Sequence, residues 1–329
     1  MNVLKKKPDV SVVITTYNHE KFIAQAIDSV LMQEVNFNFE IIIGEDESED
    51  NTRKIVMAYK NRNPEIRLFL RSRKDVIYIN NEPTGRYNFI RNLQAAKGKY
   101  IALLEGDDYW VDKKKLQKQY DFLENNKNYT VCFHIAEIVD VTGKLSNKYW
   151  QPLDNKAYYT KEDLFLRCNF IPTASVMFVN RLFNYFPDWF YSFNVADWPL
   201  HILNSSYGKI KFIDEVMSAY RVHPSGISSS KSGMQLFHLR LEMYDSFKEI
   251  FGKKYYYPIN KAVSLVYYKL ACLYEEKKDK KNALKYVLKN IFWFYYDLNV
   301  FKLKLKLLLR IVFPHIYKKL KDIKSKIIK

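Results

Sequence analysis

The N-terminal half of the chain alternates short apolar runs with stretches of helical spacing. The runs are rich in β-branched residues and have the length of strands buried on both faces of a sheet. These runs are Val10–Thr15, Phe39–Ile43, Ile66–Leu70 and Tyr100–Leu104. Between them, helical spacing of apolar residues is found over Phe22–Gln33, Asn51–Arg62 and Asn88–Ala96. Strands and helices that alternate through short links predict an α/β fold with an open, mainly parallel sheet flanked by helices.

Beyond Trp110 the pattern is mixed and then becomes helical. We expect a helix at Lys115–Asn125 and strands at Val131–Val141, Phe170–Val179 and Ile210–Val216. From about Met234 onward the spacing is helical, and a helical hairpin is predicted over Ala262–Glu276 and Asn282–Tyr296. One hairpin cannot bury its own apolar face, so we expect it to pack on the main domain. We therefore divide the chain into a main domain (residues 1–230) and a C-terminal helical extension (residues 231–329).

Acidic clusters directly follow two of the predicted strands. Gly44 is followed by the sequence EDESED, and the strand ending at Leu104 is followed by Glu105-Gly106-Asp107-Asp108. Ligands of open parallel sheets bind at the carboxyl ends of the strands, so both clusters should face one crevice. Carboxylates this close disfavour one another's ionisation unless a cation is near, and such hard oxygen ligands suit Mg²⁺ or Mn²⁺. For an isolated Glu-Gly-Asp-Asp sequence, a solvated acidic turn is the alternative.

Composition indicates a folded intracellular protein. The chain has 329 residues, of which 48% are hydrophobic and 16% aromatic, which is ample for a packed core. Its three cysteines lie far apart, which fits neither a disulfide framework nor a zinc site. The first eight residues are polar and basic and lack the apolar stretch of a secretion signal, so we expect a cytoplasmic location.

The net charge of +17 is concentrated at the C-terminal end. Residues 231–329 hold 23 Lys and Arg against 8 Asp and Glu, whereas residues 1–230 are nearly balanced. Residues 300–329 combine ten basic side chains with many leucines and isoleucines. Phe301–Phe313 reads as an interfacial segment, although the alternation at Lys302–Lys306 fits a strand as well as a helix. We predict that this end binds an anionic membrane surface, at the inner face of the cell membrane. A solvated lysine-rich helix that packs on the protein is the alternative.

Six segments in order along the chain together resemble one enzyme family. They are VSVVITTYN (10–18), FEIIIGEDESEDNT (39–52), GKYIALLEGDDYW (98–110), NFIPTASVMF (169–178), ADWPL (196–200) and YRVH (220–223). The resemblance is to the inverting, metal-dependent glycosyltransferases of family 2, which have the nucleotide-sugar-binding fold called GT-A. It implies transfer of a sugar from a UDP-sugar donor to a hydroxyl of a glycan or lipid-linked acceptor. It also implies Mn²⁺ or Mg²⁺ as cofactor and a single displacement.

The resemblance also implies roles for particular residues. Asp197 matches the general base, and Asp107 and His223 match the metal ligands. The positions that match nucleotide-sugar contacts are Thr15, Tyr17, Asp46, Arg86, Glu105 and Arg221. Of these, Thr15 and Tyr17 would line the nucleotide pocket, Asp46 would accept a hydrogen bond from uracil, and Arg86 and Arg221 would lie near the diphosphate. The sequence departs from the family pattern at Glu105, which replaces the first Asp of the D-x-D motif, and at Glu47, where Gly or Cys is commoner.

Other interpretations stay open at this point. Asp197 precedes Trp198-Pro199 and could simply cap a helix, because Pro favours the first helical turn. His223 could be an ordinary loop histidine, and we expect the remaining histidines, His19 among them, to be structural or exposed. A sugar nucleotidyltransferase of related fold would carry a glycine-rich basic loop after the first strand, where this chain has TTYNHE. A basic nucleic-acid-binding protein is suggested only by the pI of 9.4, and no nucleic-acid motif accompanies it, so we expect no nucleic-acid partner.

Overall fold

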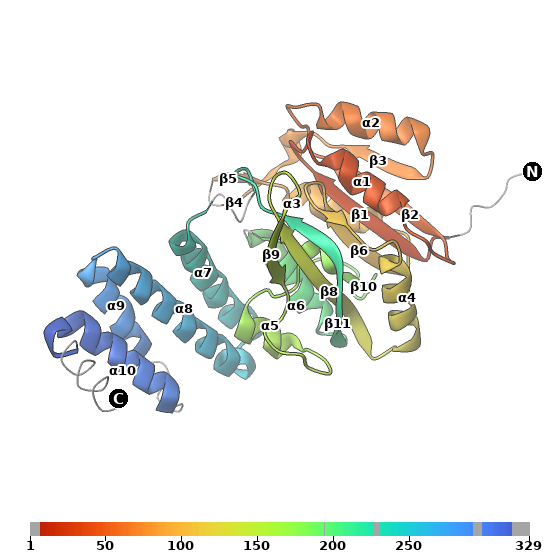
Figure 1. Cartoon of the computed structure of the whole chain (residues 1–329). Coiled ribbons are helices and arrows are strands. Elements are labelled where there is room, and N and C mark those ends of the chain that lie inside the picture. Colours follow the sequence, from red (N-terminus) through yellow and green to blue (C-terminus); the bar gives the residue numbers. More distant parts are fainter. Residues whose placement is uncertain (1–6, 80, 194, 227–230, 292–297, 318–329) are drawn as a thin grey trace, which may run out of the picture. The chain divides into compact units, whose positions relative to one another are not determined.

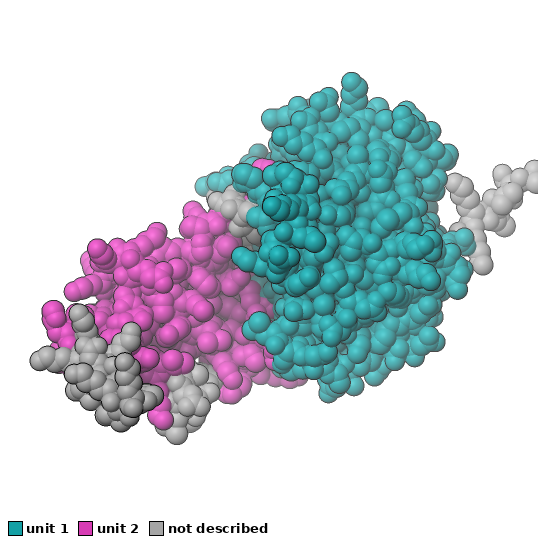
Figure 2. All heavy atoms as spheres, viewed as in Figure 1, with its two compact units in different colours: residues 1–164, 169–224 teal, residues 165–168, 225–329 magenta. Residues whose placement is uncertain are grey.

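The computed structural model describes residues 7–79, 81–193, 195–226, 231–291 and 298–317 (Figure 1). They form two compact units (Figure 2). Unit 1 comprises residues 1–164 and 169–224, and unit 2 comprises residues 165–168 and 225–329.

The first half of unit 1 has the predicted alternation of strands and helices. Its elements are β1 (Val10–Thr16), α1 (Ile23–Leu31), β2 (Phe39–Glu45), α2 (Thr52–Arg62), β3 (Ile66–Leu70), α3 (Arg86–Ala95) and β6 (Tyr100–Glu105). β3, β2, β1 and β6 are parallel neighbours in that order. The register places Ile14 of β1 beside Ile43 and Leu104, and all three side chains are buried. The acidic ends of β2 and β6 therefore lie at the same edge of the sheet.

The second half of unit 1 extends this sheet with antiparallel as well as parallel pairs. It adds β7 (Tyr109–Trp110), β8 (Tyr129–Val139), β9 (Leu145–Trp150), β10 (Met177–Val179) and β11 (Lys209–Arg221). The described sheet has nine strands, in the order β3-β2-β1-β6-β10-β8-β11-β7, with β9 paired to β8. β10 is antiparallel to both neighbours, whereas β8 and β11 are parallel. The sheet is thus mixed. The four neighbours β3, β2, β1 and β6 are all parallel, whereas the rest of the sheet combines parallel and antiparallel pairs.

One predicted strand is largely wrong. Only the last three residues of Phe170–Val179 pair, as β10, and Thr173–Ser175 form a 3₁₀ turn instead. Pro172 precedes this turn and has no N–H to give to a sheet ladder. Its carbonyl accepts a hydrogen bond from Ser175 Oγ (2.7 Å), which holds the turn. The non-strand residues are left at the edge of the sheet that bears the acidic clusters.

Several short elements of unit 1 carry no clear periodicity and were not predicted. They are the hairpin of β4 (Ile77–Ile79) and β5 (Glu82–Thr84), the helices α5 (Lys161–Arg167) and α6 (Asp197–Asn204), and the 3₁₀ turns Arg73–Asp75 and Asp188–Ser192. The predicted helix α4 (Lys115–Asn125) is present with the expected bounds. The 3₁₀ turn at Arg73 and helix α6, which were not predicted, contribute side chains to the candidate site.

Unit 2 is helical, as predicted for this part of the sequence. It contains α7 (Gly233–Phe251), α8 (Tyr256–Glu276), α9 (Lys280–Ile291) and α10 (Leu298–Val312). α8 and α9 form the predicted hairpin, and residues 292–296 of that prediction lie outside the described residues. Lys302–Lys306 is helical, which decides between the two geometries left open. No helix among the described residues is both long enough and apolar enough to cross a bilayer.

Candidate active site

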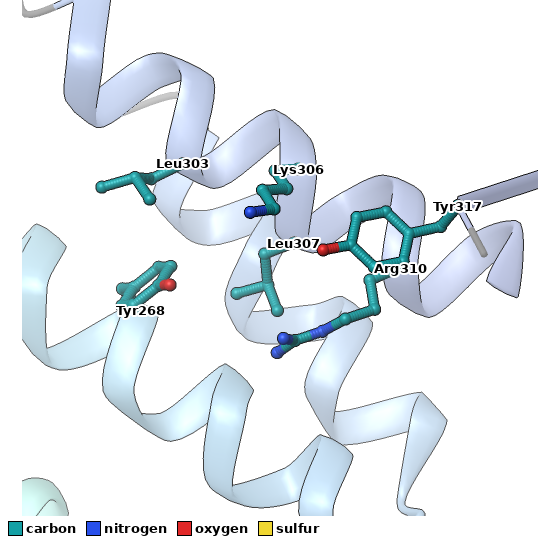
Figure 3. Close-up of a pocket in the computed structure, with 6 residues that line it drawn as sticks. All are labelled: Tyr268, Leu303, Lys306, Leu307, Arg310 and Tyr317. Carbon is teal, nitrogen blue, oxygen red and sulfur yellow. The ribbon is translucent and has the colours of Figure 1, made fainter. Parts of the chain in front are cut away.

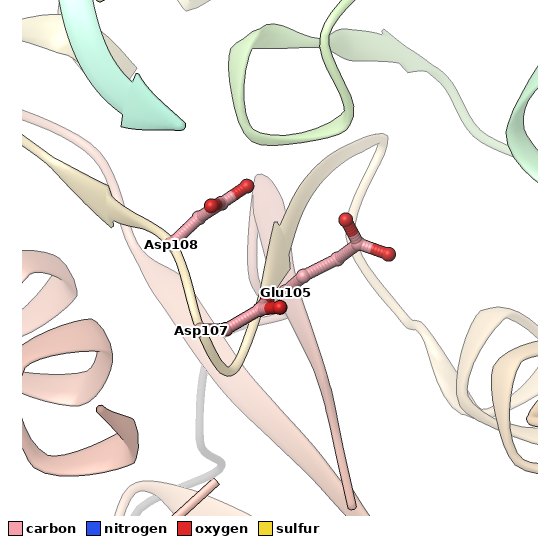
Figure 4. Close-up of side chains that lie close together, drawn as sticks. All are labelled: Glu105, Asp107 and Asp108. Carbon is pink, nitrogen blue, oxygen red and sulfur yellow. The ribbon is translucent and has the colours of Figure 1, made fainter. Parts of the chain in front are cut away.

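Three carboxylates meet at the turn between β6 and β7 (Figure 4). One oxygen from each of Glu105, Asp107 and Asp108 lies within 4.8 Å of the others. Burial raises the pKa of Glu105 to about 8, and the charges of Asp107 and Asp197 add to that rise. Asp107 Oδ1 and Asp108 Oδ2 are buried and have no hydrogen-bond partner among the described residues. Buried, unpaired carboxylate oxygens are unfavourable unless a cation binds them, so this cluster fits a divalent metal ion.

Two histidines approach Asp107. His223 Nε2 lies 2.9 Å from Asp107 Oδ2, and His19 Nε2 lies 3.7 Å from the same oxygen. Burial alone would raise the pKa of Asp107, but its hydrogen bond with His223 and the nearby imidazoles outweigh that effect and lower it. The structure thus brings together the two residues predicted as metal ligands, and their binding of a metal stays a prediction. His19 is a residue that sequence reasoning missed, because nothing local distinguishes it from the other histidines except its place just after β1.

Gly106 makes this close arrangement possible. A Cβ atom on Gly106 would lie 2.6 Å from Thr16 Oγ1 and 2.7 Å from His19 Nδ1. Contacts that short do not occur, so a side chain at this position would force Thr16, His19 or the acidic turn itself to shift. The glycine between Glu105 and Asp107 is therefore required by packing against the end of β1.

Arg221 ties the acidic turn to the end of β11. Its backbone N–H donates to Asp108 Oδ1 (2.8 Å), and its Nε donates to the carbonyl of Asp107 (2.9 Å). Nη1 donates to the carbonyls of Asp140 and Val141, and Nη2 to Gln25 Oε1 (2.7 Å). Arg221 as a whole is 5% exposed, and its guanidinium lies over the rings of Phe22 and Tyr109. Arg221 thus holds the turn in place, and its contact with the diphosphate stays a prediction.

A second group of side chains lies at the end of β2. Arg73 Nη1 donates to Asp46 Oδ2 (3.1 Å), and the guanidinium lies over the ring of Tyr17 at 4.2 Å. Asp46 Oδ1 is buried and has no partner among the described residues, and burial raises the pKa of this carboxyl to about 6 despite the nearby Arg73. Thr15 lies in β1 between Gly44 and Glu105. The structure therefore brings Thr15, Tyr17 and Asp46 to one edge, and adds Arg73, which no sequence motif indicates.

The departure from the family pattern at Glu47 has a local explanation. Glu47 has a φ of +59°, a left-handed conformation that favours glycine. Its Oε2 accepts a hydrogen bond from the backbone N–H of Arg73 (2.6 Å). This bond fixes the turn that places Arg73 beside Asp46, which helps to offset the strained backbone.

Asp197 is the first residue of α6 and is half-buried. The N-cap residue of α6 is Ala196, and Asp197 lies in the first turn of the helix. Oδ1 accepts a hydrogen bond from the N–H of Trp198 (2.7 Å), and Oδ2 accepts one from Asn169 Nδ2 (2.6 Å). Burial raises the pKa of Asp197, although the hydrogen bond from Trp198 and the charge of Arg86 oppose this rise. A partly buried carboxylate with a raised pKa suits a general base.

Arg86, the first residue of α3, contacts the backbone of the residues that precede Asp197. It is 3% exposed, and its Nη2 donates to the carbonyls of Phe193 and Val195. Burial lowers its pKa to about 10, and the charge of Asp197 partly offsets this. Nε and Nη1 have no hydrogen-bond partner among the described residues. The predicted contact of Arg86 with the diphosphate stays a prediction.

A sequence profile of the family described as Glycosyl transferase family 2 matches residues 11–186, more than half of the chain. The chain belongs to glycosyl transferase family 2. An uncharacterized protein of Mycobacterium tuberculosis strain H37Rv is 35% identical to this family 2 protein over 219 residues. That match covers 66% of this chain and 60% of the relative, so the chain spans less than two thirds of that relative's length.

A further relative has a name that states a reaction. WfaP of Escherichia coli, a UDP-Glc:α-D-GlcNAc-diphosphoundecaprenol β-1,3-glucosyltransferase, is 29% identical over 226 residues. The match covers 68% of this family 2 protein and 80% of WfaP.

Solved structures confirm the predicted fold class. S. aureus TarS 1–349 in complex with UDP-GlcNAc superposes with a TM-score of 0.59 at 15% identity, covering 92% of this chain and 86% of that one. The mannosyltransferase PcManGT from Pyrobaculum calidifontis, in complex with GDP-Man and Mn²⁺, superposes with a TM-score of 0.50 at 14% identity, covering 94% and 89%. At these identities the likeness shows the GT-A fold alone.

Proposed function

We propose that this protein is an inverting, metal-dependent glycosyltransferase that moves a sugar from a UDP-sugar to a hydroxyl of a glycan or lipid-linked acceptor. The observation that carries the proposal is that carboxylate oxygens of Glu105, Asp107 and Asp108 lie within 4.8 Å of one another, with Asp197 close enough for its charge to act on Glu105. Family membership and the GT-A fold support the reaction class.

The group around Asp46 would bind the nucleotide base. Asp46 Oδ1 is an unpaired acceptor suited to a ring N–H of the base, and Tyr17 places an aromatic ring, stacked with the Arg73 guanidinium, beside it. The structural neighbours were solved with UDP-GlcNAc or GDP-Man, so the fold alone does not select the base. UDP is favoured by the stated donor of the relative WfaP.

Asp107 and His223 would hold the metal ion, and the carboxylate oxygen of Asp107 suits Mn²⁺ or Mg²⁺. When bound, such an ion supplies positive charge to the diphosphate as it departs. The chain's own contribution is to fix the ligands: Arg221 holds the backbone of Asp107, and Gly106 lets the turn pack against β1.

Asp197 would take the proton of the acceptor hydroxyl. The acceptor oxygen attacks the anomeric carbon, the bond from that carbon to the β-phosphate oxygen breaks, and UDP leaves with the electron pair. The proton passes to the Asp197 carboxylate, and one displacement inverts the anomeric centre. General-base assistance of this kind contributes about 10²–10⁴ in rate.

A panel of UDP-sugars and GDP-mannose, assayed for release of nucleotide with Mn²⁺ or Mg²⁺, tests this proposal. We expect release from one or a few UDP-sugars, dependent on the metal. Asp197→Asn should bind the donor with wild-type affinity and transfer at least about 100-fold more slowly. Release of no nucleotide from any sugar by the wild-type protein, with and without undecaprenyl-diphosphate-linked acceptors, would contradict the proposal.

We also propose that the protein acts at the cytoplasmic face of the membrane through α10. The face of α10 that contains Lys304, Leu307 and Ile311 is buried in unit 2, and Lys304 Nζ donates to the carbonyl of Asn290. The opposite face exposes Leu305 beside Lys302 and Lys306, and Phe313, directly after the helix, is exposed as well. Figure 3 shows Lys306 at a small pocket of about 90 Å³ between α8 and α10. Exposed apolar and basic side chains on one helix face favour an anionic lipid surface.

Point substitutions test this location better than truncation, because removing α10 would expose the surface that packs on Leu307. We expect the double variant Lys302→Glu/Lys306→Glu to remain in solution with vesicles of acidic phospholipid that pellet the wild-type protein at low salt. The matched control is Lys54→Glu/Lys97→Glu, which makes the same charge change at exposed positions of unit 1. Equal sedimentation of the three proteins would contradict membrane binding through α10.

A further inference from the structure

Asn169 makes the closest side-chain contact of Asp197. It lies directly before Phe170–Val179, the stretch where most of the predicted strand did not form, and four residues before the 3₁₀ turn Thr173–Ser175. Asn169 Nδ2 is 2.6 Å from Asp197 Oδ2, whereas Thr173 Oγ1 is 3.5 Å from the same oxygen. The amide of Asn169 therefore supplies the main side-chain hydrogen bond to this carboxylate.

The orientation of the Asn169 amide is fixed by the backbone. Its Oδ1 accepts a hydrogen bond from the N–H of Ile171 (3.1 Å). Only a carbonyl oxygen can accept that bond, so the NH₂ group must face Asp197. Asn169 is consequently a donor to Asp197 at every pH at which the protein folds, and it adds no charge of its own.

The remaining contacts hold the backbone before Asp197 and the other oxygen of its carboxylate, and leave the position of Oδ2 mainly to Asn169. Arg86 fixes the carbonyls of Phe193 and Val195, which precede Asp197. The N–H of Trp198 binds the other carboxylate oxygen. The charged groups that act on Asp197 are Arg86 of α3, which favours the carboxylate, and Glu105 of β6, which opposes it.

We propose that Asn169 is a positioning residue for the general base: its amide holds the Asp197 carboxylate so that one oxygen faces the acceptor hydroxyl. The inference rests on the proposed function of Asp197. The hydrogen bond itself does not, because it is formed by the protein alone. Loss of the amide would leave Oδ2 with only the longer contact to Thr173, so that the carboxylate is held mainly through Oδ1 by Trp198, and would also remove a donor that stabilises its ionised form.

The test compares Asn169→Ala, Asn169→Asp and the control Asn184→Ala, an exposed asparagine of unit 1. We expect Asn169→Ala to lower kcat about 10–100-fold at pH 7 with the donor affinity unchanged. We expect the acidic limb of its pH–rate profile to move upward by about one pH unit. Asn169→Asp can donate only when protonated, so its rate relative to Asn169→Ala should rise as the pH falls. Asn184→Ala should match the wild type in all these measurements.

A second measurement does not depend on turnover. In protein labelled with ¹³C at the aspartate carboxyl carbon, the Asp197 signal should titrate about one pH unit higher in Asn169→Ala than in the wild type. If Asn169→Ala does not fold, Asn169→Ser, which keeps a short donor, takes its place. If Asn169→Ala has the pH–rate profile of the wild type and its Asp197 signal titrates as in the wild type, the positioning role is overturned. The proposed function is still supported in that case if Asp197→Asn is inactive. If the Asp197 titration moves in Asn169→Ala but the wild-type protein transfers no sugar, the hydrogen bond is supported and the proposed function is contradicted.

Discussion

Replacing Arg221 with lysine tests how firmly the acidic turn depends on one planar side chain. Lysine keeps the positive charge but offers one ammonium group in place of the guanidinium fork. Arg221 donates from three nitrogens to groups on several sides: the carbonyl of Asp107, the carbonyls of Asp140 and Val141, and Gln25 Oε1. An ammonium group at the end of a flexible chain cannot reach all of these sides together.

The size of the effect follows from these contacts. A hydrogen bond that involves a charged group contributes about 1.5–3 kcal/mol, and a lysine would recover only part of the set. The residue is 5% exposed, so water cannot readily replace the lost donors. We therefore expect Arg221→Lys to lower the free energy of unfolding by about 2–4 kcal/mol. Because the bond to the Asp107 carbonyl is among those at risk, metal-dependent affinity for UDP should fall about tenfold or more.

Urea unfolding gives the first quantity, and calorimetric titration of UDP with and without Mn²⁺ gives the second. Arg62→Lys is the matched control, because Arg62 is exposed in the last turn of α2. This control should change the free energy of unfolding by less than about 0.5 kcal/mol and leave UDP binding unchanged. A loss of less than about 1 kcal/mol in Arg221→Lys, with wild-type UDP affinity, would refute the role of Arg221 as the clamp of the turn.

Three other substitutions examine the site. Asp107→Asn should abolish the metal-dependent part of UDP binding, and calorimetry that finds this part intact would remove Asp107 from the metal site. Gly106→Ala should destabilise the fold by about 1–3 kcal/mol and weaken the same binding, because its Cβ would overlap Thr16 and His19; thermal unfolding and UDP titration check it. Because the pKa of Asp46 is raised from 3.8 to about 6, its contribution to stability is present below 3.8 and lost as the pH rises through 6. Asp46→Asn should therefore increase the free energy of unfolding more at pH 8 than at pH 5, and equal gains at both would argue against the shift.

Local pattern alone was enough to predict the first half of the fold. β1, β2, β3 and β6 agree with the predicted strands to within two residues at each end. In β1 and β6, which lie inside the sheet, nearly every residue is buried, and a strand buried on both faces must be largely apolar. The same reasoning placed the acidic clusters at one edge of the sheet. It failed at Phe170–Val179, where Pro172 and the turn after it override an apolar composition typical of strands.

The residues of the candidate site likewise fall into those that the sequence could predict and those that it could not. Asp46, Asp107, Asp197 and His223 could be predicted because each belongs to a short motif whose residues are adjacent in sequence. The partners of these residues could not be predicted. Arg73 is 27 residues from Asp46 in the sequence, and Asn169 is 28 residues from Asp197. His19, which follows β1, contacts Asp107, which follows β6. Motifs record where a functional group sits in the chain, whereas the orientation and ionisation of that group depend on hydrogen bonds, burial and charges supplied by distant segments. Only the tertiary structure brings those segments together.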